Sequence, residues 1–347
     1  MQPYKARVIR DLIGKSRRIF KIPVYQRNYD WKNTQCKKLF EDILKAYDKD
    51  KDHFMGTMVY LKITDSSQLE EVLIIDGQQR ITSIYILLKA LYDYAKKEEN
   101  YKLEDIIKDY LFNKKCEENQ KLKLKPIKSD NEQLNYLMKN ELEELSKESN
   151  IYQNYILFDN LIEEALSKNY TIEDILEGIE KLEVVEIVLD NSQGDEAQII
   201  FESINSTGLE LSVADLIRNY LLMDDKKQEF LFEEYWLKIE KMIGYDNLEE
   251  FFLHFLNSKL SDVISSKNIY QKFKIYYEKN FKNHEEILLL LKKYAYYYSA
   301  FIGKNEKYSV EINECLNSFS MINQTTIYPF LLLLFDDFES KKINEKE

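Results

Sequence analysis

The sequence contains little glycine, proline or cysteine. Its 347 residues include 8 Gly, 4 Pro and 3 Cys, while 44% are hydrophobic and 32% are charged. This composition excludes collagen-like, low-complexity and disulfide-rich proteins, and it is typical of a soluble, helix-rich chain. The cysteines, Cys36, Cys116 and Cys315, lie far apart and form no CxxC pair, which indicates a reducing compartment.

Long apolar segments are also missing. The longest apolar run, residues 327–335, is shorter than the roughly 20 residues that cross a bilayer. The N-terminal stretch carries charges where a signal peptide would be apolar. We therefore expect a cytoplasmic protein without a membrane partner.

Arginine is scarce among the cations. The net charge of −12 makes the surface as a whole repel polyanions, so contact with nucleic acid must be local. Of the 49 Lys and Arg residues only seven are Arg. A guanidinium offers a planar fork of five donors, so we expect arginine where phosphate or carboxylate is bound. Arg27, Arg80 and Arg218 fall within the three motifs described below.

Histidine is equally rare. His53, His254 and His284 have no partners at the spacing of metal ligands or of a nuclease site, so we expect them to be surface or packing residues. Ser/His/Asp and Cys/His catalysis have no support in the sequence, and a GxxxxGK[ST] phosphate loop is absent.

Hydrophobic periodicity predicts an α+β fold: a small mixed sheet with helices, followed by a helical part. The expected elements are a helix at 5–13, an extended stretch at 19–25, a helix at 33–49, a hairpin of strands 54–63 and 69–75, a long helix after 77, a strand at 184–189 and a helix at 196–204. Residues 100–182 read as a helical insertion without evident chemistry. We therefore divide the chain into domains 1–225 and 226–347, and expect Tyr294–Tyr298 to pack in a core rather than stack on bases.

The first motif, Asp76-Gly77-Gln78-Gln79-Arg80, joins a strand to a helix. Unpaired N–H groups and the positive end of the helix dipole attract an anion there, and Gly77 allows a phosphate close to the backbone. Gln78 and Gln79 would supply amide donors or orient a water. Arg80 in the first turn costs about 0.3–1 kcal/mol unless a negative group compensates, either Asp76 or a ligand. The alternative is an Asp76 N-cap followed by ordinary helix formers.

The second motif covers residues 22–31 and crowds Tyr25, Gln26 and Arg27 around a proline-stiffened segment. Such a loop suits a base or a sugar, with Arg27 reaching a phosphate. The alternative is a packed edge strand in which Arg27 pairs with Asp30 or Asp42.

The third motif covers residues 201–219. Ser212 and Asp215 have the spacing of a capping box, which begins a helix. The preceding loop contains Asn205 and Gly208, an amide and a flexible residue that suit a ligand-facing turn. Read as architecture alone, the segment is a well-capped helix-loop-helix, and this alternative stays open.

Together these motifs carry a family resemblance. The segments IPVYQRNYDW, FMGTMVY, IIDGQQRITSIYIL and FESINSTGLELSVADLIRNYLL follow one another over roughly residues 10–225. In this order they resemble the N-terminal domain of GmrSD-type modification-dependent restriction endonucleases. The resemblance implies a ParB/sulfiredoxin-like core in which Gly77 and Arg80 grip nucleotide phosphates. It also implies that nucleoside triphosphate hydrolysis regulates DNA cleavage in phage defence.

The resemblance assigns candidate roles to the motif residues. Asp76, Gln78, Gln79 and Arg80 would act in catalysis, with Asp76 placing Mg²⁺ or water. The nucleotide and its phosphates would contact a second set: Gly77, Tyr25, Gln26, Arg27, Asn205, Gly208 and Asp215. The expected partners are a nucleoside triphosphate and modified DNA.

Restriction proteins of this kind usually continue into a His-Asn-His nuclease half, for which this chain has no place. We expect that half beyond residue 347, in a separate nuclease subunit, or not at all. A second hypothesis is a non-enzymatic module that senses DNA modification, with Arg7, Arg10, Arg17 and Arg18 contacting the DNA backbone. Direct nuclease activity finds little support, because the sequence supplies no metal pair or nucleophile.

Overall fold

The computed structural model describes residues 4–65, 69–114, 116, 121–189, 212–223, 227–261, 263–321 and 324–344. The chain forms two compact units, Met1–Phe201 and Glu202–Glu347, which are considered separately. The helix expected at 196–204, together with Asn205 and Gly208, lies outside the described residues. The domain boundary near residue 225 stays a prediction.

The first unit contains a six-stranded mixed sheet in the order β1-β6-β3-β4-β2-β5. Its strands are β1 (Tyr4–Arg7), β2 (Arg18–Lys21), β3 (His53–Asp65), β4 (Glu70–Asp76), β5 (Leu124–Lys125) and β6 (Leu182–Leu189). The antiparallel β3–β4 pair confirms the predicted hairpin. Strand β6 confirms the predicted return to the sheet, where it lies between β1 and β3 and runs parallel to β3.

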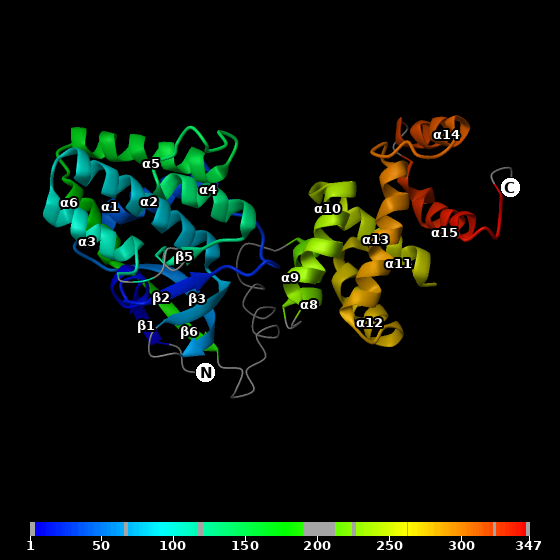
Figure 1. Ribbon diagram of the computed structural model, residues 1–347, viewed down its shortest axis with the longest axis horizontal. Coiled ribbons are helices and arrows are strands. Elements are labelled where there is room, and N and C mark those ends of the chain that lie inside the picture. Colours follow the sequence, from blue (N-terminus) through cyan, green and yellow to red (C-terminus); the bar gives the residue numbers. More distant parts are fainter. Residues whose placement is uncertain are drawn as a thin grey trace. The chain divides into compact units, whose positions relative to one another are not determined.

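Helices of the first unit gather on one side of this sheet (Figure 1). They are α1 (Asn33–Asp48), α2 (Gln78–Lys97), α3 (Tyr101–Leu111), α4 (Lys128–Met138), α5 (Asn150–Ser167) and α6 (Ile172–Glu180). The apolar positions of α2 predicted from periodicity are buried, including Ile81, Ile84 and Leu88. Residues 100–182, expected as an insertion, contribute Ile107 and Phe158 to the same core, so they help to hold α2 in place.

Two local predictions are wrong in detail. The helix expected at 5–13 is strand β1 followed by a π-helix, η1 (Val8–Ile13), in which Gly14 N–H donates to Ile9 O at 2.6 Å. Its apolar side chains are nevertheless all buried. The prediction failed because a buried face alone does not distinguish a π-turn from an α-turn. The extended stretch ends as a strand at Lys21, since Pro23 has no N–H for a ladder hydrogen bond.

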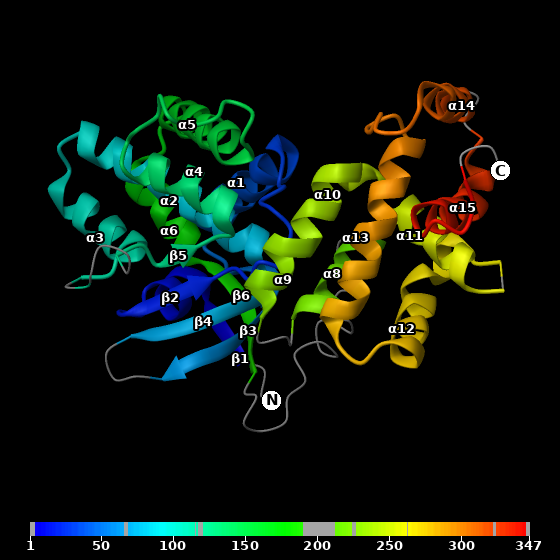
Figure 2. The same ribbon diagram turned by 45° about the vertical axis from the view of Figure 1, so that its right-hand side comes forward.

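The described part of the second unit is helical, as predicted, with α13 running among its other helices (Figure 2). The elements are α8 (Val213–Leu222), α9 (Gln228–Leu231), η4 (Phe232–Trp236), α10 (Leu237–Ile243), η5 (Tyr245–Asn247), α11 (Leu248–Lys259), η6 (Ser266–Asn268), α12 (Ile269–Asn280), α13 (His284–Phe301), α14 (Val310–Met321), η7 (Thr325–Ile327) and α15 (Tyr328–Glu339). Tyr294, Tyr297 and Tyr298 are buried against phenylalanine rings, which confirms aromatic packing. None of the helices in the described stretches has the length and apolar character of a membrane span.

Candidate functional site

The turn between β4 and α2 forms the centre of the candidate site. Gly77, with φ +99°, is the N-cap of α2, and within the described ranges no side chain caps the helix. The alternative in which Asp76 is the N-cap is therefore wrong. A helix that begins without a capping side chain keeps its first N–H groups available to an anion, and the dipole adds positive potential there.

Arg80 is held by two acceptors beside this turn. Its Nη2 donates to Asp76 Oδ2 at 2.9 Å and its Nη1 donates to Met55 O at 2.8 Å. The two side chains are 17% and 26% exposed, so the ion pair borders the surface. Asp76 thus supplies the negative charge that a cation in the first turn of a helix requires.

Gly56 in β3 is a site residue to which sequence reasoning gave no role. Its φ is +102°, and a Cβ at this position would lie 2.6 Å from Arg80 Nη1. A Cβ on Gly77 would lie 3.5 Å from Arg80 Nη2. The guanidinium therefore lies against the backbone of both glycines. The available signal was the glycine within FMGTMVY, an unusual residue inside a strand.

The second motif lies next to the first. Gln26 Nε2 donates to Ile75 O, and Gln78 Nε2 donates to Gln26 Oε1, each at 3.1 Å. Tyr25 is buried. Gln26 therefore lies over the end of β4 and the start of α2, although about 50 residues separate these segments in the sequence.

Gln79 uses its whole amide to hold the chain after Arg27. Its Oε1 accepts from the N–H groups of Asp30 at 2.7 Å and Trp31 at 3.1 Å, and its Nε2 donates to Asn28 O at 3.0 Å. In this arrangement the amide positions residues 28–31 rather than facing open solvent.

Arg27 is half-buried and has no ion pair with another residue in the described ranges. The predicted alternative partners are engaged elsewhere: Asp30 pairs with Lys32 at 2.9 Å and Asp42 pairs with Lys38 at 2.7 Å. The alternative in which Arg27 pairs with one of these aspartates is therefore wrong.

Asp130 of α4 is a further residue that the sequence did not indicate. Its Oδ2 accepts from the N–H of Tyr29 at 2.6 Å, and burial raises the pKa of Asp130 to about 6. Asn150 of α5 donates to Tyr29 O at 2.9 Å. Residues from α2, α4 and α5 therefore fix the segment that follows Arg27.

Asp215 belongs to the second unit, at the start of α8. Ser212 accepts from the Asp215 N–H at 3.1 Å, which confirms the predicted cap. The Asp215 carboxylate accepts from Arg218 at 2.6 Å and from Tyr245 at 2.9 Å, and it is almost fully buried. Within this unit Asp215 fixes α8, and its role toward a nucleotide stays a prediction.

Metal ligands are sparse in the part of the chain that the structure describes. No group of three or more His, Cys, Asp or Glu residues there has the arrangement of a metal site. Asp76 is the carboxylate at the turn, and it already accepts from Arg80. His254 is a packing residue, as predicted: it lies against Tyr298 and Tyr328, and burial lowers its pKa to about 4.

Three of the four proposed DNA-contacting arginines pair with acidic side chains, while Arg17 is exposed. Arg7 pairs with Asp52 at 2.9 Å, Arg10 with Glu180 at 2.5 Å and Arg18 with Glu70 at 2.6 Å. Arg18 is also buried. Since phosphate contacts require exposed cations, these pairs weaken the case for a basic patch here.

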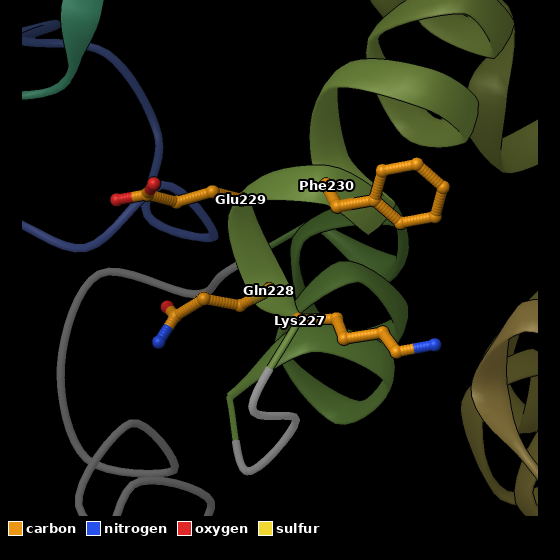
Figure 3. A pocket seen from close by; sticks show the side chains of 4 residues that line it. All are labelled: Lys227, Gln228, Glu229 and Phe230. Atoms are coloured by element: carbon orange, nitrogen blue, oxygen red, sulfur yellow. The ribbon is translucent and has the colours of Figure 1, made fainter.

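The second unit has a cavity of about 560 Å³ beside α9, lined by Lys227–Phe230. Figure 3 shows Gln228 and Glu229 extending to one side of the helix, and Lys227 and Phe230 to the other. These four side chains therefore do not converge on one point, as the groups of a catalytic site must.

Comparison with known proteins agrees with the resemblance. No curated protein matches the chain. Residues 9–222 match the family model described as GmrSD restriction endonuclease, N-terminal domain. This range includes all three motifs and more than half of the 347 residues. The chain therefore belongs to the family of GmrSD restriction endonuclease N-terminal domains.

Proposed function

We propose that the first unit binds a nucleoside triphosphate at the start of α2 and hydrolyses it to regulate DNA restriction. The observation that carries the proposal is the contact between the uncapped Asp76–Arg80 turn and the segment that bears Arg27. The family membership supplies the setting, because its members are N-terminal domains of restriction endonucleases.

The local charge favours a polyanion although the whole chain is acidic. Asp76 and Met55 O occupy two of the five N–H donors of Arg80, and the helix N-terminus and Arg27 add positive charge near the turn. A helix N-terminus acts as roughly half a positive charge, and a guanidinium binds phosphate through paired N–H donors. Such a site selects a multiply charged phosphate ester over a neutral ligand.

Five residues of the first two motifs then have roles in the proposal. Arg80 and Arg27 stabilise charge on the phosphates, while Asp76 orients the attacking water. Gln78 and Gln79 act through position, since their amides hold the 26–31 segment. Mg²⁺ would be carried by the triphosphate oxygens with Asp76 as its protein ligand, because Mg²⁺ at nucleotide sites needs only one or two carboxylates.

The test measures binding of ATP, GTP, CTP and UTP by calorimetry with Mg²⁺ present, followed by phosphate release. Arg80→Ala and Arg27→Ala are each expected to weaken binding by about 10- to 100-fold, the usual loss for a charge-assisted hydrogen bond. Arg10→Ala is the matched control, because Arg10 is exposed and pairs with Glu180 outside the motifs.

The outcomes separate binding from catalysis. Turnover that is lost in Asp76→Ala while nucleotide binding persists supports hydrolysis. Equal turnover in wild type and Asp76→Ala rules out the assigned role of Asp76. Binding without turnover, with or without DNA, would make the site a nucleotide sensor. If none of the four nucleotides binds, the proposal is wrong.

A further inference from the structure

The Arg80 guanidinium is confined by backbone from two separate elements. On one side lie Met55 and Gly56 of β3, and on the other lie Asp76 and Gly77 of the turn. Both glycines have positive φ, a conformation that other residues adopt at a cost. Gly56 in β3 thus contacts the Arg80 guanidinium from one side as Gly77 of the first motif does from the other.

A β-bulge brings this part of β3 to Arg80. Phe54 pairs with Glu183 of β6 and Thr57 pairs with Val185, so a step of three residues in β3 faces a step of two in β6. Bulges redirect groups that would otherwise join the ladder, and they occur often beside active sites. Here Met55 O accepts from Arg80 Nη1 at 2.8 Å.

We propose that Gly56 is a positioning residue that fixes the orientation in which Arg80 meets a phosphate. The inference rests on the proposed function for its ligand, and on contacts within the first unit for its geometry. With Nη1 held by Met55 O and Nη2 by Asp76, the guanidinium cannot rotate without losing an acceptor. Such a pre-organised guanidinium binds an oxyanion without first losing side-chain freedom.

In addition to the strain of a side chain at φ +102°, a methyl group at residue 56 would collide with Arg80. The added Cβ would lie 2.6 Å from Nη1, and the next atom that it meets, Arg80 Cζ, lies at 3.7 Å. Since Nη1 is the end of a flexible side chain, the side chain yields and the guanidinium moves. A displacement of about 1 Å in a binding group is enough to reduce function by up to about 100-fold.

Gly303→Ala is a matched control for backbone strain. Gly303 also has positive φ, at +70°, but a Cβ there would meet only Asn317 Oδ1, at 3.7 Å. Gly56→Ala and Gly303→Ala both place a side chain at positive φ, and only Gly56→Ala adds a contact with Arg80. Any difference in nucleotide affinity between them reports on that contact.

The decisive experiment is a double-mutant cycle on triphosphate affinity. Gly56→Ala alone is expected to weaken binding by about 10- to 100-fold, as a lost charged contact does, while Gly303→Ala leaves it within about twofold. In an Arg80→Ala background, Gly56→Ala should have no further effect. A loss of equal size in both backgrounds, or no loss in the wild-type background, would overturn the inference.

A second measurement needs no nucleotide. In the ligand-free protein, the Nε–Hε NMR signal of Arg80 is assigned as the one that disappears in Arg80→Ala. Gly56→Ala should shift this signal, whereas Gly303→Ala should leave it unchanged. An unmoved signal in Gly56→Ala overturns the positioning role, whereas failure of the wild type to bind triphosphate overturns the proposed function. The two failures are thus distinguishable.

A further variant covers the case in which Gly56→Ala unfolds the chain. Lysine has no atom equivalent to Nη1, so Gly56→Ala combined with Arg80→Lys removes the contact and is expected to fold. Circular dichroism of that double variant decides the point. If it is also unfolded, the strain belongs to the backbone and the inference is wrong.

Discussion

Replacing Gln79 by leucine is expected to release the backbone of residues 28–31 from α2 while α2 itself stays folded. The Gln79 side chain is only 8% exposed and makes three hydrogen bonds to that segment. Leucine has a similar volume and remains buried, so little apolar packing is lost. The change therefore isolates the polar contacts.

The magnitude follows from those three bonds. Each hydrogen bond contributes about 0.5–1.5 kcal/mol net, and the lower part of that range applies here because Asn28 and Asp30 are exposed and their backbone groups are open to water once released. The sum is about 2 kcal/mol. If the loss is local, amide exchange at Asp30 and Trp31 should become roughly 30-fold faster, since 1.4 kcal/mol corresponds to tenfold.

Hydrogen exchange measured by NMR tests this estimate, with urea denaturation as a check on global stability. Gln79→Glu is the informative comparison, because a carboxylate keeps the acceptor for Asp30 and Trp31 and replaces the donor to Asn28 O by a charged oxygen. Gln153→Leu, at an exposed position of α5, is the control for a surface change. If amide exchange at Asp30 and Trp31 in Gln79→Leu stays within twofold of the wild-type rate, Gln79 does not hold residues 28–31 in place.

Two further predictions concern the first unit. Burial raises the pKa of Asp130 from 3.8 to about 6, so the folded state holds this proton more tightly and the contribution of Asp130 to stability falls as the pH rises from about 4 to about 6. Asp130→Asn, which can still accept from Tyr29, should raise the free energy of unfolding by up to about 3 kcal/mol at pH 7.5 and change it little at pH 4. Equal effects in urea denaturation at both pH values would contradict this. In α6, a Cβ on Gly178 would lie 2.5 Å from Ile43 O in the backbone of α1. Gly178→Ala should therefore destabilise the unit by about 1–3 kcal/mol. A gain in melting temperature would instead show that α1 and α6 can move apart without loss of stability.

The periodic elements of this protein could be predicted because burial repeats along each of them. Ile81, Ile84 and Leu88 are buried at helical spacing, and the strand at 184–189 entered the sheet as expected. The helix at 5–13 was wrong for the same reason, since its burial pattern is also satisfied by a short strand and a π-turn. Local patterns therefore indicate which side chains are buried and leave the hydrogen-bond pattern open.

The site was only partly accessible to sequence reasoning. The β4–α2 turn was found because glycine between a strand and a helix is a local signal, and Gln26 was found as part of a polar loop. The sequence did not predict the contributions of Gly56 and Asp130, or that Gln79 holds residues 28–31. Their contacts join residues 24, 101 and about 50 positions apart in the chain, respectively.

The sequence by itself determined the α+β character, the strand-turn-helix order around Gly77 and the family to which the chain belongs. Tertiary structure decided what the motif residues do: Asp76 compensates Arg80, Gln79 holds a neighbouring loop and Gly56 makes room for a guanidinium. The physical reason is that conformational preference and hydrophobic period are properties of neighbouring residues. Which donor meets which acceptor depends instead on strand register, on a bulge in β3 and on the packing of α4 and α5, none of which a single segment encodes.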